Sequence, residues 1–151
     1  MQSTVSSNFI TRLGWFREVT GGQNLILSHT SALECLGFFV GYFHENEINA
    51  YATEQGPYEN ISYHIVDSLD DIDVVRRGSL LCTSPSRTFN DILSKYGTPE
   101  EFTVDERALV EGLCKYYLAN GNSFNGLYIS PRNMPYFERL KDWAIEFYDE
   151  N

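Results

Sequence analysis

The apolar residues of this chain follow two different periods, and this change of period most limits the folds that the chain can adopt. Apolar and polar residues alternate at 48–53 and again at 61–66, which predicts two half-buried strands. Gly56-Pro57 lies between them and indicates a hairpin. After residue 84 the apolar residues instead recur at three- and four-residue steps, as in helices. The sequence therefore predicts an α+β fold, in which a small, mainly antiparallel sheet packs against about four helices and the C-terminal half is helical.

Cap and stop signals locate these elements. A short strand at 25–27 is followed by a helix with Ser28, Thr30 or Ser31 as its N-cap, and a further strand is expected at 79–83, after an acidic loop at 67–73. The other helices are expected from Pro85, behind the N-cap Ser84, to Gly97; from the capping box Thr103-Val104-Asp105-Glu106 to Asn120-Gly121; and from Met134 to Tyr148. The predicted buried faces are Ala32, Leu33, Leu36, Phe39 and Val40; Phe89, Ile92, Leu93 and Tyr96; Leu109, Val110, Leu113, Tyr117 and Leu118; and Phe137, Leu140, Trp143, Ala144 and Phe147.

Size and charge limit the classes of function. With 151 residues, 42% of them hydrophobic, the chain is expected to form a single domain over residues 1–151. Eleven Lys and Arg against 21 Asp and Glu give a net charge of -10, which disfavours direct binding to nucleic acid or to an anionic membrane. The longest apolar run, residues 36–43, is too short to span a bilayer, and no signal peptide is recognisable, so a cytoplasmic location is expected.

The common catalytic and metal-binding motifs are missing from the sequence. Cys35, Cys82 and Cys114 lack ligand spacing and are predicted to be buried free thiols. Asp71-Ile72-Asp73 precedes Gly78-Ser79, which is the reverse of the order that a nucleotidyltransferase needs. The glycine motifs of phosphate-binding loops and of serine nucleophiles are absent from the sequence. Nothing brings the three histidines, His29, His44 and His64, together with a nucleophile. We therefore expect no catalytic residue, no metal and no cofactor.

Two sets of charged residues have both a structural and a functional interpretation. Arg76-Arg77 follows three aspartates, so the pair either forms a local ion-pair cluster or binds an acidic protein partner. Arg87 and Asp91 are four residues apart in a predicted helix and are expected to pair. Because Arg87 would lie near the positive end of that helix, we expect it to be partly buried and to have a second acceptor on the sheet or on a loop.

Two segments resemble the effector half of AbiEi-type antitoxins. Residues 28–37 read Ser-His-Thr-Ser-Ala-Leu-Glu-Cys-Leu-Gly, similar to the family segment in which Ser-Ala-Leu precedes a short helix ending in Leu-Gly. Residues 83–93 read Thr-Ser-Pro-Ser-Arg-Thr-Phe-Asn-Asp-Ile-Leu, similar to the second family motif, Thr-Ser-Pro, Arg-Thr and then Asp-Leu-Leu. The polar motif residues, expected to be structural, are Ser28, Ser31, Ser84, Pro85, Arg87, Thr88 and Asp91.

The resemblance implies a protein-binding function. In the family this domain usually follows a winged helix that binds the operator, and it opposes a nucleotidyltransferase-like toxin encoded beside it. The resemblance extends from about Asn24 to Lys95, so only about 23 residues precede it and it implies the effector domain alone. We expect a non-enzymatic, antitoxin-like protein that neutralises a toxin or another mobile-element defence component. The alternatives are an acidic phage-type inhibitor that mimics nucleic acid, and a small enzyme with an unrecognised carboxylate site.

Overall fold

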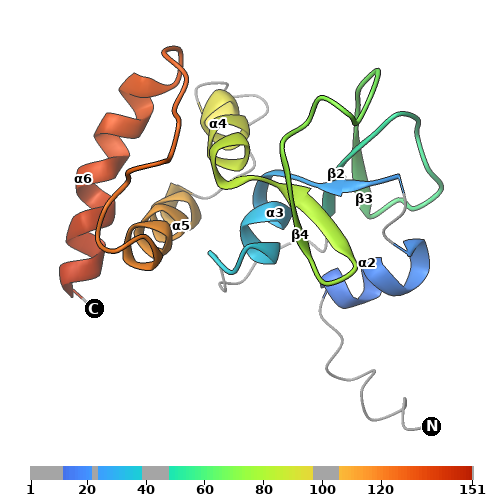
Figure 1. Cartoon of the computed structure of the whole chain (residues 1–151), viewed down its shortest axis with the longest axis horizontal. Helices are drawn as coiled ribbons and strands as arrows, with labels where there is room; N and C mark the ends of the chain where they lie inside the picture. Colours follow the sequence, from blue (N-terminus) through green and yellow to red (C-terminus); the bar gives the residue numbers. More distant parts are fainter. Residues whose placement is uncertain (1–11, 22–23, 39–47, 97–105, 151) are drawn as a thin grey trace, which may run out of the picture.

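The computed structural model describes residues 12–21, 24–38, 48–96 and 106–150, and it confirms the α+β class with helices in the C-terminal half (Figure 1). The helices are α2 (Arg12–Thr20), α3 (His29–Cys35), α4 (Pro85–Tyr96), α5 (Glu106–Ala119) and α6 (Met134–Glu150). The strands are β1 (Ile26–Leu27), β2 (Ile48–Ala52), β3 (Ile61–Ile65), β4 (Val74–Arg77) and β5 (Leu80–Thr83). No helix in these ranges has the length and apolar character needed to cross a membrane.

The five strands form one mixed sheet in the order β3-β2-β1-β5-β4. Two pairings, β1 with β2 and β4 with β5, are antiparallel, whereas β1–β5 and β2–β3 are parallel. The predicted hairpin around Gly56-Pro57 is therefore wrong. The connection 53–60 carries the chain back, so that Ile61 pairs with Ile48 at the start of β2. Alternating apolar residues mark strands without giving their direction, and this connection reverses the chain before β3 begins.

Alternation along the strands gives the sheet two differently covered faces. Ala50 and Cys82 point toward α2 and α3 and belong to one buried cluster with side chains of these helices. On the opposite face Ile26 and Tyr51 pack against Ile72, which comes from the connection between β3 and β4. This acidic connection is a loop, as predicted, and it also serves as the cover of that face.

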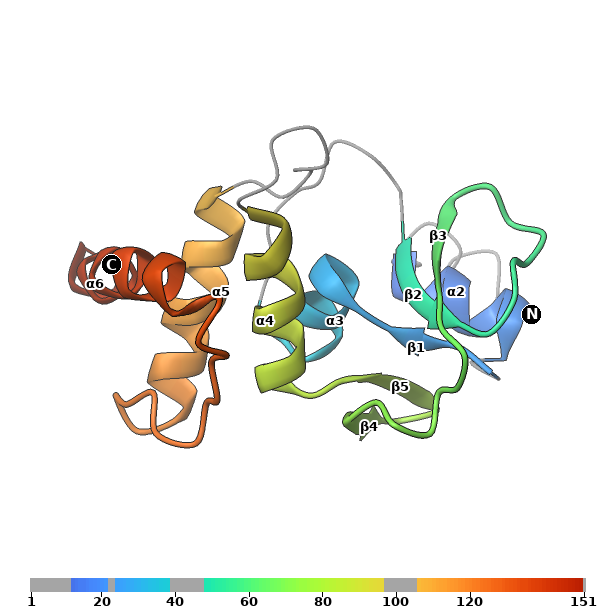
Figure 2. The ribbon, with the colours of Figure 1, turned by 90° about the horizontal axis from the view of Figure 1, so that it is seen from above.

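The helices continue outward from the sheet in the order α3, α4 and then the pair α5 and α6 (Figure 2). They enclose a second buried cluster, in which Leu33 of α3 contacts residues of the three later helices. Phe89, Leu113 and Leu140 are among its fully buried members. Because α3 contributes to both clusters, it joins the sheet to the helical half.

Several predictions about the helices need correction. Leu118 and Trp143 are 41% and 45% exposed, because the buried side of α5 ends one turn earlier and that of α6 is restricted to residues in line with Leu140 and Ala144. Helix α2 was not predicted, although its apolar residues Leu13, Phe16 and Val19 recur at three-residue steps. The predictions at Phe39 and Val40, at 103–105 and for the side chains of Tyr96 and Phe147 lie outside the described residues.

Candidate functional site

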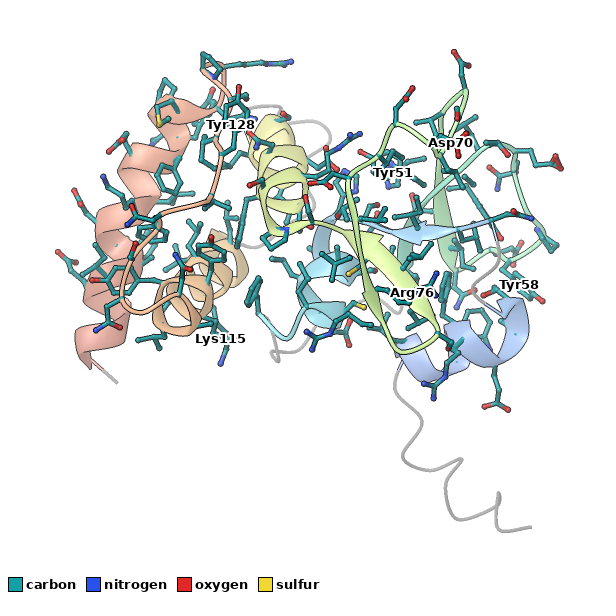
Figure 3. All side chains as sticks on the ribbon, in the orientation of Figure 1. Tyr51, Tyr58, Asp70, Arg76, Lys115 and Tyr128 are labelled. Atoms are coloured by element: carbon teal, nitrogen blue, oxygen red, sulfur yellow. The ribbon has the colours of Figure 1, made fainter. Side chains whose placement is uncertain are left out.

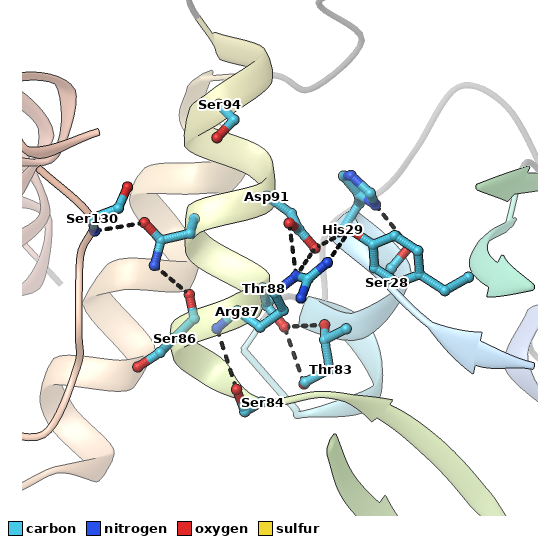
Figure 4. A network of polar contacts seen from close by, with 12 residues as sticks. Ser28, His29, Thr83, Ser84, Ser86, Arg87, Thr88, Asp91, Ser94 and Ser130 are labelled. Atoms are coloured by element: carbon cyan, nitrogen blue, oxygen red, sulfur yellow. Dashed lines mark hydrogen bonds and ion pairs between the residues drawn. The ribbon is translucent and has the colours of Figure 1, made fainter. Parts of the chain in front are cut away.

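The two motif segments meet on the sheet face that carries Tyr51, where they form one group of polar side chains (Figure 4). We call this group the motif cluster. It consists of Ser28, His29, Thr30, Ser31, Asn49, Tyr51, His64, Thr83, Ser84, Arg87, Thr88 and Asp91. The residues come from the start of α3, from β2 and β3, and from the junction between β5 and α4. The parallel pairing of β1 with β5 brings the ends of these two strands, and hence the two motifs, next to each other.

Tyr51 connects the cluster to α4. Its hydroxyl donates a hydrogen bond to Oδ2 of Asp91 at 2.7 Å and accepts one from Nη2 of Arg87 at 3.2 Å. The Nε of Arg87 lies 3.1 Å from Oδ1 of Asp91, and its guanidinium carbon lies 5.0 Å from the centre of the Tyr51 ring. The Arg87 side chain is 35% exposed. The predicted pair with Asp91, the partial burial of Arg87 and its second acceptor on the sheet are thus confirmed.

The first motif contributes a chain of contacts from α3 to the sheet. Ser28 Oγ lies 2.7 Å from Nδ1 of His29, whose ring stacks on that of His64 with 4.4 Å between centroids. Nε2 of His64 lies 2.9 Å from Oδ1 of Asn49, and the Asn49 backbone N–H donates to Ser31 Oγ at 2.9 Å. Ser28 stands at the N-cap position of α3 but makes no side-chain cap bond there, because its hydroxyl faces the histidine instead.

The second motif builds the start of α4. Ser84 Oγ accepts the backbone N–H of Arg87 at 3.2 Å, which confirms the predicted N-cap, and Pro85 is the first helical residue. The Thr88 hydroxyl lies 2.6 Å from that of Thr83 and also donates to the Thr83 carbonyl at 3.1 Å. Both threonines are fully buried, so this pair fastens the first turn of α4 to the end of β5.

Burial and charge keep Tyr51 and Arg87 in one protonation state at neutral pH. Burial, together with the Asp91 carboxylate, raises the pKa of Tyr51 to about 12. Burial alone would lower the pKa of Arg87, but the hydrogen bond to Tyr51 and the charge of Asp91 raise it. Arg87 is therefore a cation, and Tyr51 is neutral and donates its proton to Asp91. A phenol held in this way is a poor general base near pH 7.

The accessibility of the cluster restricts what it can do chemically. Ser28 is fully buried and His29 is 6% exposed, so the contact between them does not present a nucleophile to a substrate. Within the described part of the chain, every buried side-chain nitrogen or oxygen has a hydrogen-bond partner, and no group of three His, Cys, Asp or Glu residues is placed to hold a metal. The cluster thus holds α3 and α4 on the sheet through satisfied polar contacts.

The remaining charged and thiol candidates lie elsewhere. Arg76 and Arg77 are exposed on the edge strand β4, and Figure 3 shows Arg76 there. Successive strand residues point to opposite faces, so the two guanidinium groups do not form one patch, and in the described residues neither is ion-paired with the preceding aspartates. Cys82 and Cys114 are buried as predicted, whereas Cys35 is partly exposed. His44 lies outside the described residues.

A polar connection between α4 and the segment before α6 was not anticipated from the sequence. Asn90 of α4 donates to the Tyr128 carbonyl at 2.8 Å and accepts the backbone N–H of Ser130 at 2.9 Å. Asn133, only 2% exposed, donates to the Asn90 side-chain oxygen at 3.0 Å and to Ser94 Oγ at 3.1 Å. The available signal was Asn90 itself. It directly precedes Asp91 in the motif and is a polar residue on the side of the helix away from the sheet.

A hollow of about 310 Å³ lies apart from the motif cluster, between the end of α2 and the connection 53–60. Tyr58 and Tyr63 line it, and the Tyr58 backbone N–H donates to the Tyr63 hydroxyl at 3.2 Å. A Cβ atom at Gly56 would come within 2.5 Å of the same hydroxyl, so only glycine fits beneath this ring without displacing it. The hollow shares no lining residue with the motif cluster.

Comparisons of the chain with protein-family models, with curated proteins and with solved structures found no match.

Proposed function

We propose that this chain is a non-enzymatic protein-binding domain that neutralises a toxin or another mobile-element defence component, as AbiEi-type antitoxins do. The observation that carries the proposal is the convergence of both motif segments in the motif cluster. Ser28, Thr83 and Thr88 are among its fully buried residues, and their hydroxyls bond to neighbouring side chains. Buried and bonded motif residues stabilise the fold. This supports a binding function that is carried by the outer surface of the domain.

Affinity capture followed by co-expression tests this proposal. The tagged chain is used to capture proteins from its native host, and each captured protein is then expressed alone and together with the chain in a bacterial host. We expect one partner whose expression alone arrests growth and whose toxicity the chain relieves. If no captured protein is toxic, or if the chain does not relieve the toxicity, the proposal is wrong.

The exposed arginines of β4 are the proposed contact for that partner. An edge strand has an unpaired side, and cations on it favour an acidic partner surface. Arg76→Glu and Arg77→Glu are each expected to weaken capture of the partner by about tenfold or more. Arg132→Glu is the matched control, because Arg132 is an exposed arginine on the segment before α6. Equal effects of all three would show that total charge, and not β4, decides binding.

A second candidate, an acidic mimic of nucleic acid, is favoured by the connections on either side of β3. Residues 53–73 contain no Lys or Arg, and all six of their carboxylates are exposed: Glu54, Glu59, Asp67, Asp70, Asp71 and Asp73. Figure 3 shows Asp70 on the side of the molecule away from α6. For this function, duplex DNA or RNA must displace the chain from its partner, and changing Asp70, Asp71 and Asp73 to Asn must weaken the complex. The control is the corresponding neutralisation of three carboxylates on α6, those of Glu138, Asp142 and Glu146.

A further inference from the structure

Two cysteines that are 47 residues apart in the sequence meet where α3 packs on the sheet. Cys35 is the last residue of α3, and Cys82 lies in β5 on the face that this helix covers. Cys35 packs against the buried cluster that contains Cys82, close enough for each thiol to shift the pKa of the other. Cys82 is fully buried, while Cys35 is partly exposed. One residue of the pair is therefore partly exposed to solution, and the other lies beside it in the buried cluster.

The surroundings of the pair favour a thiolate at the outer position. The hydrogen bond from Cys82 and the charge of Arg77 lower the pKa of Cys35, against the opposing effects of burial and of Glu34. The same contact with Cys35, together with burial, raises the pKa of Cys82. Arg77 pairs with Leu80 in the β4–β5 ladder and so faces the same side of the sheet as Cys82. Cys114 lies in the other buried cluster, among the helices.

We propose that Cys35 and Cys82 form a hydroperoxide-reactive dithiol site that closes to an intramolecular disulfide. The Cys35 sulfur attacks one peroxide oxygen, the O–O bond breaks, and the other oxygen leaves as water after taking up a proton. Cys35 is then a sulfenic acid. The Cys82 sulfur attacks the Cys35 sulfur, the S–O bond breaks, and the hydroxyl leaves as a second water with the Cys82 proton. Two electrons pass from the two thiols to hydrogen peroxide.

The disulfide would link the two segments that carry the motif cluster. Cys35 ends the helix that begins at His29, and Cys82 directly precedes Thr83. A cross-link here closes a long loop of the unfolded chain, which stabilises the folded state. We therefore expect the oxidised protein to melt at a temperature higher by about 5 °C or more than the reduced protein.

Peroxide treatment of the fully reduced 151-residue chain tests the proposal. Equimolar hydrogen peroxide is added, and the products are analysed by non-reducing peptide mapping and by thermal melting. We expect a monomer that has lost two hydrogens, one peptide pair linking Cys35 to Cys82, and a rise in melting temperature that a dithiol reductant reverses. Oxidation of Cys114 as fast as that of Cys35, a disulfide between two chains, or a stable oxidised Cys35 without the link would each overturn the proposal.

Cysteine variants separate the two steps. In Cys82→Ser, the Cys35 sulfenic acid is expected to accumulate and to be trapped by dimedone. In Cys35→Ser, the remaining Cys82 thiol should react with peroxide no faster than the Cys114 thiol does. Cys114→Ser is the matched control and should form the disulfide as the unmodified chain does. If Cys82→Ser does not fold, the peptide map of the unmodified chain still decides, because the link between Cys35 and Cys82 is either present or absent there.

Discussion

Tyr51 has an unusual role for a strand residue, because its side chain connects β2 with two helices. It lies in β2, its oxygen bonds to two residues of α4, and its ring lies 5.9 Å from that of His29 at the start of α3. Hydrogen bonds to charged groups contribute more than those between neutral groups, and here both partners of the phenol are charged. The orientation of α4 on the sheet therefore depends on this side chain together with the Thr83–Thr88 pair.

Alkaline pH should remove the contribution of the Tyr51 hydroxyl. The fold raises the pKa of Tyr51 to about 12, above the ordinary value of about 10. A raised pKa in the folded state means that the stabilisation is complete below a pH of about 10 and is lost as the pH rises toward about 12. The difference in free energy of unfolding between the unmodified chain and Tyr51→Phe should therefore shrink over this range, as measured by urea unfolding at each pH. A difference that stays constant would contradict the assignment.

Arg87→Ala should lower the free energy of unfolding by about 1 to 3 kcal/mol, because Asp91 and the Tyr51 hydroxyl each lose a hydrogen bond. Arg87→Lys should recover only part of this loss, since an ammonium group cannot bond Asp91 and Tyr51 in the same planar arrangement. Chemical denaturation measures both changes. Arg132→Ala, at an exposed position, should stay within about 0.5 kcal/mol. Unchanged stability of Arg87→Ala with lost partner binding would instead make Arg87 a contact residue.

The sequence predicted part of the motif cluster at the residue scale. The i,i+4 spacing of Arg87 and Asp91 and the dipole at the start of the helix led to the ion pair and to a further acceptor. They did not identify Tyr51 as that acceptor, since its partners lie about 40 residues away along the chain. The backbone conformation of His29 was also missed. Its φ of +52° is rare for a residue other than glycine, and no local pattern indicates it.

Among the elements, α4 is the one that forms polar contacts on two opposite sides. Toward the sheet it bonds through Thr88, Arg87 and Asp91, and toward α6 it bonds through Asn90. Its apolar residues Phe89, Ile92 and Leu93 fill the space between these two polar sides. The helix therefore sets the distance between the sheet and the helical half.

Asn133→Ala should loosen α6 from α4. Asn133 is 2% exposed and donates to the side chains of Asn90 and Ser94, so its loss removes these hydrogen bonds from α4, while the Asn90 oxygen keeps only its bond from the Ser130 N–H. We expect the free energy of unfolding to fall by about 1 to 3 kcal/mol and amide exchange in residues 127–133 to become faster. Asn125→Ala, at an exposed position of the same connection, is the control. Equal effects of the two substitutions would mean that the buried contact contributes nothing specific.

The element predictions succeeded where one local signal was decisive. Pro85 behind the cap Ser84 gave the start of α4, and Asn120-Gly121 gave the end of α5. Strand β4 was missed because its residues are mostly exposed and its main contact is the pairing with β5, through a tight turn at Gly78. The parallel pairing of β2 and β3 was missed for a related reason. Strand direction depends on the path of the connecting chain, which apolar periodicity does not encode.

At the scale of the whole molecule, the acidic charge is distributed unevenly around the fold. The six carboxylates of residues 53–73 lie on the two connections that flank β3, whereas the exposed Arg76 and Arg77 lie on β4 at the other edge of the sheet. Sequence order alone suggested that the aspartates of 67–73 neutralise this arginine pair. The fold separates them because the connection after β3 crosses the sheet face, and Ile72 anchors it there.

This charge distribution predicts that the chain does not bind duplex DNA specifically. A protein gains affinity for DNA by releasing counterions from phosphates, and a net charge of -10 opposes the approach of the two polyanions. Gel-shift titration with the promoter fragment of its own gene, at about 0.15 M salt, should show no complex at micromolar protein. The variant with Asp67, Asp70, Asp71 and Asp73 changed to Asn should bind more at low salt than the unmodified chain does, without sequence preference. A salt-sensitive shift of the promoter fragment at sub-micromolar unmodified protein would show instead that local cationic residues outweigh the net charge.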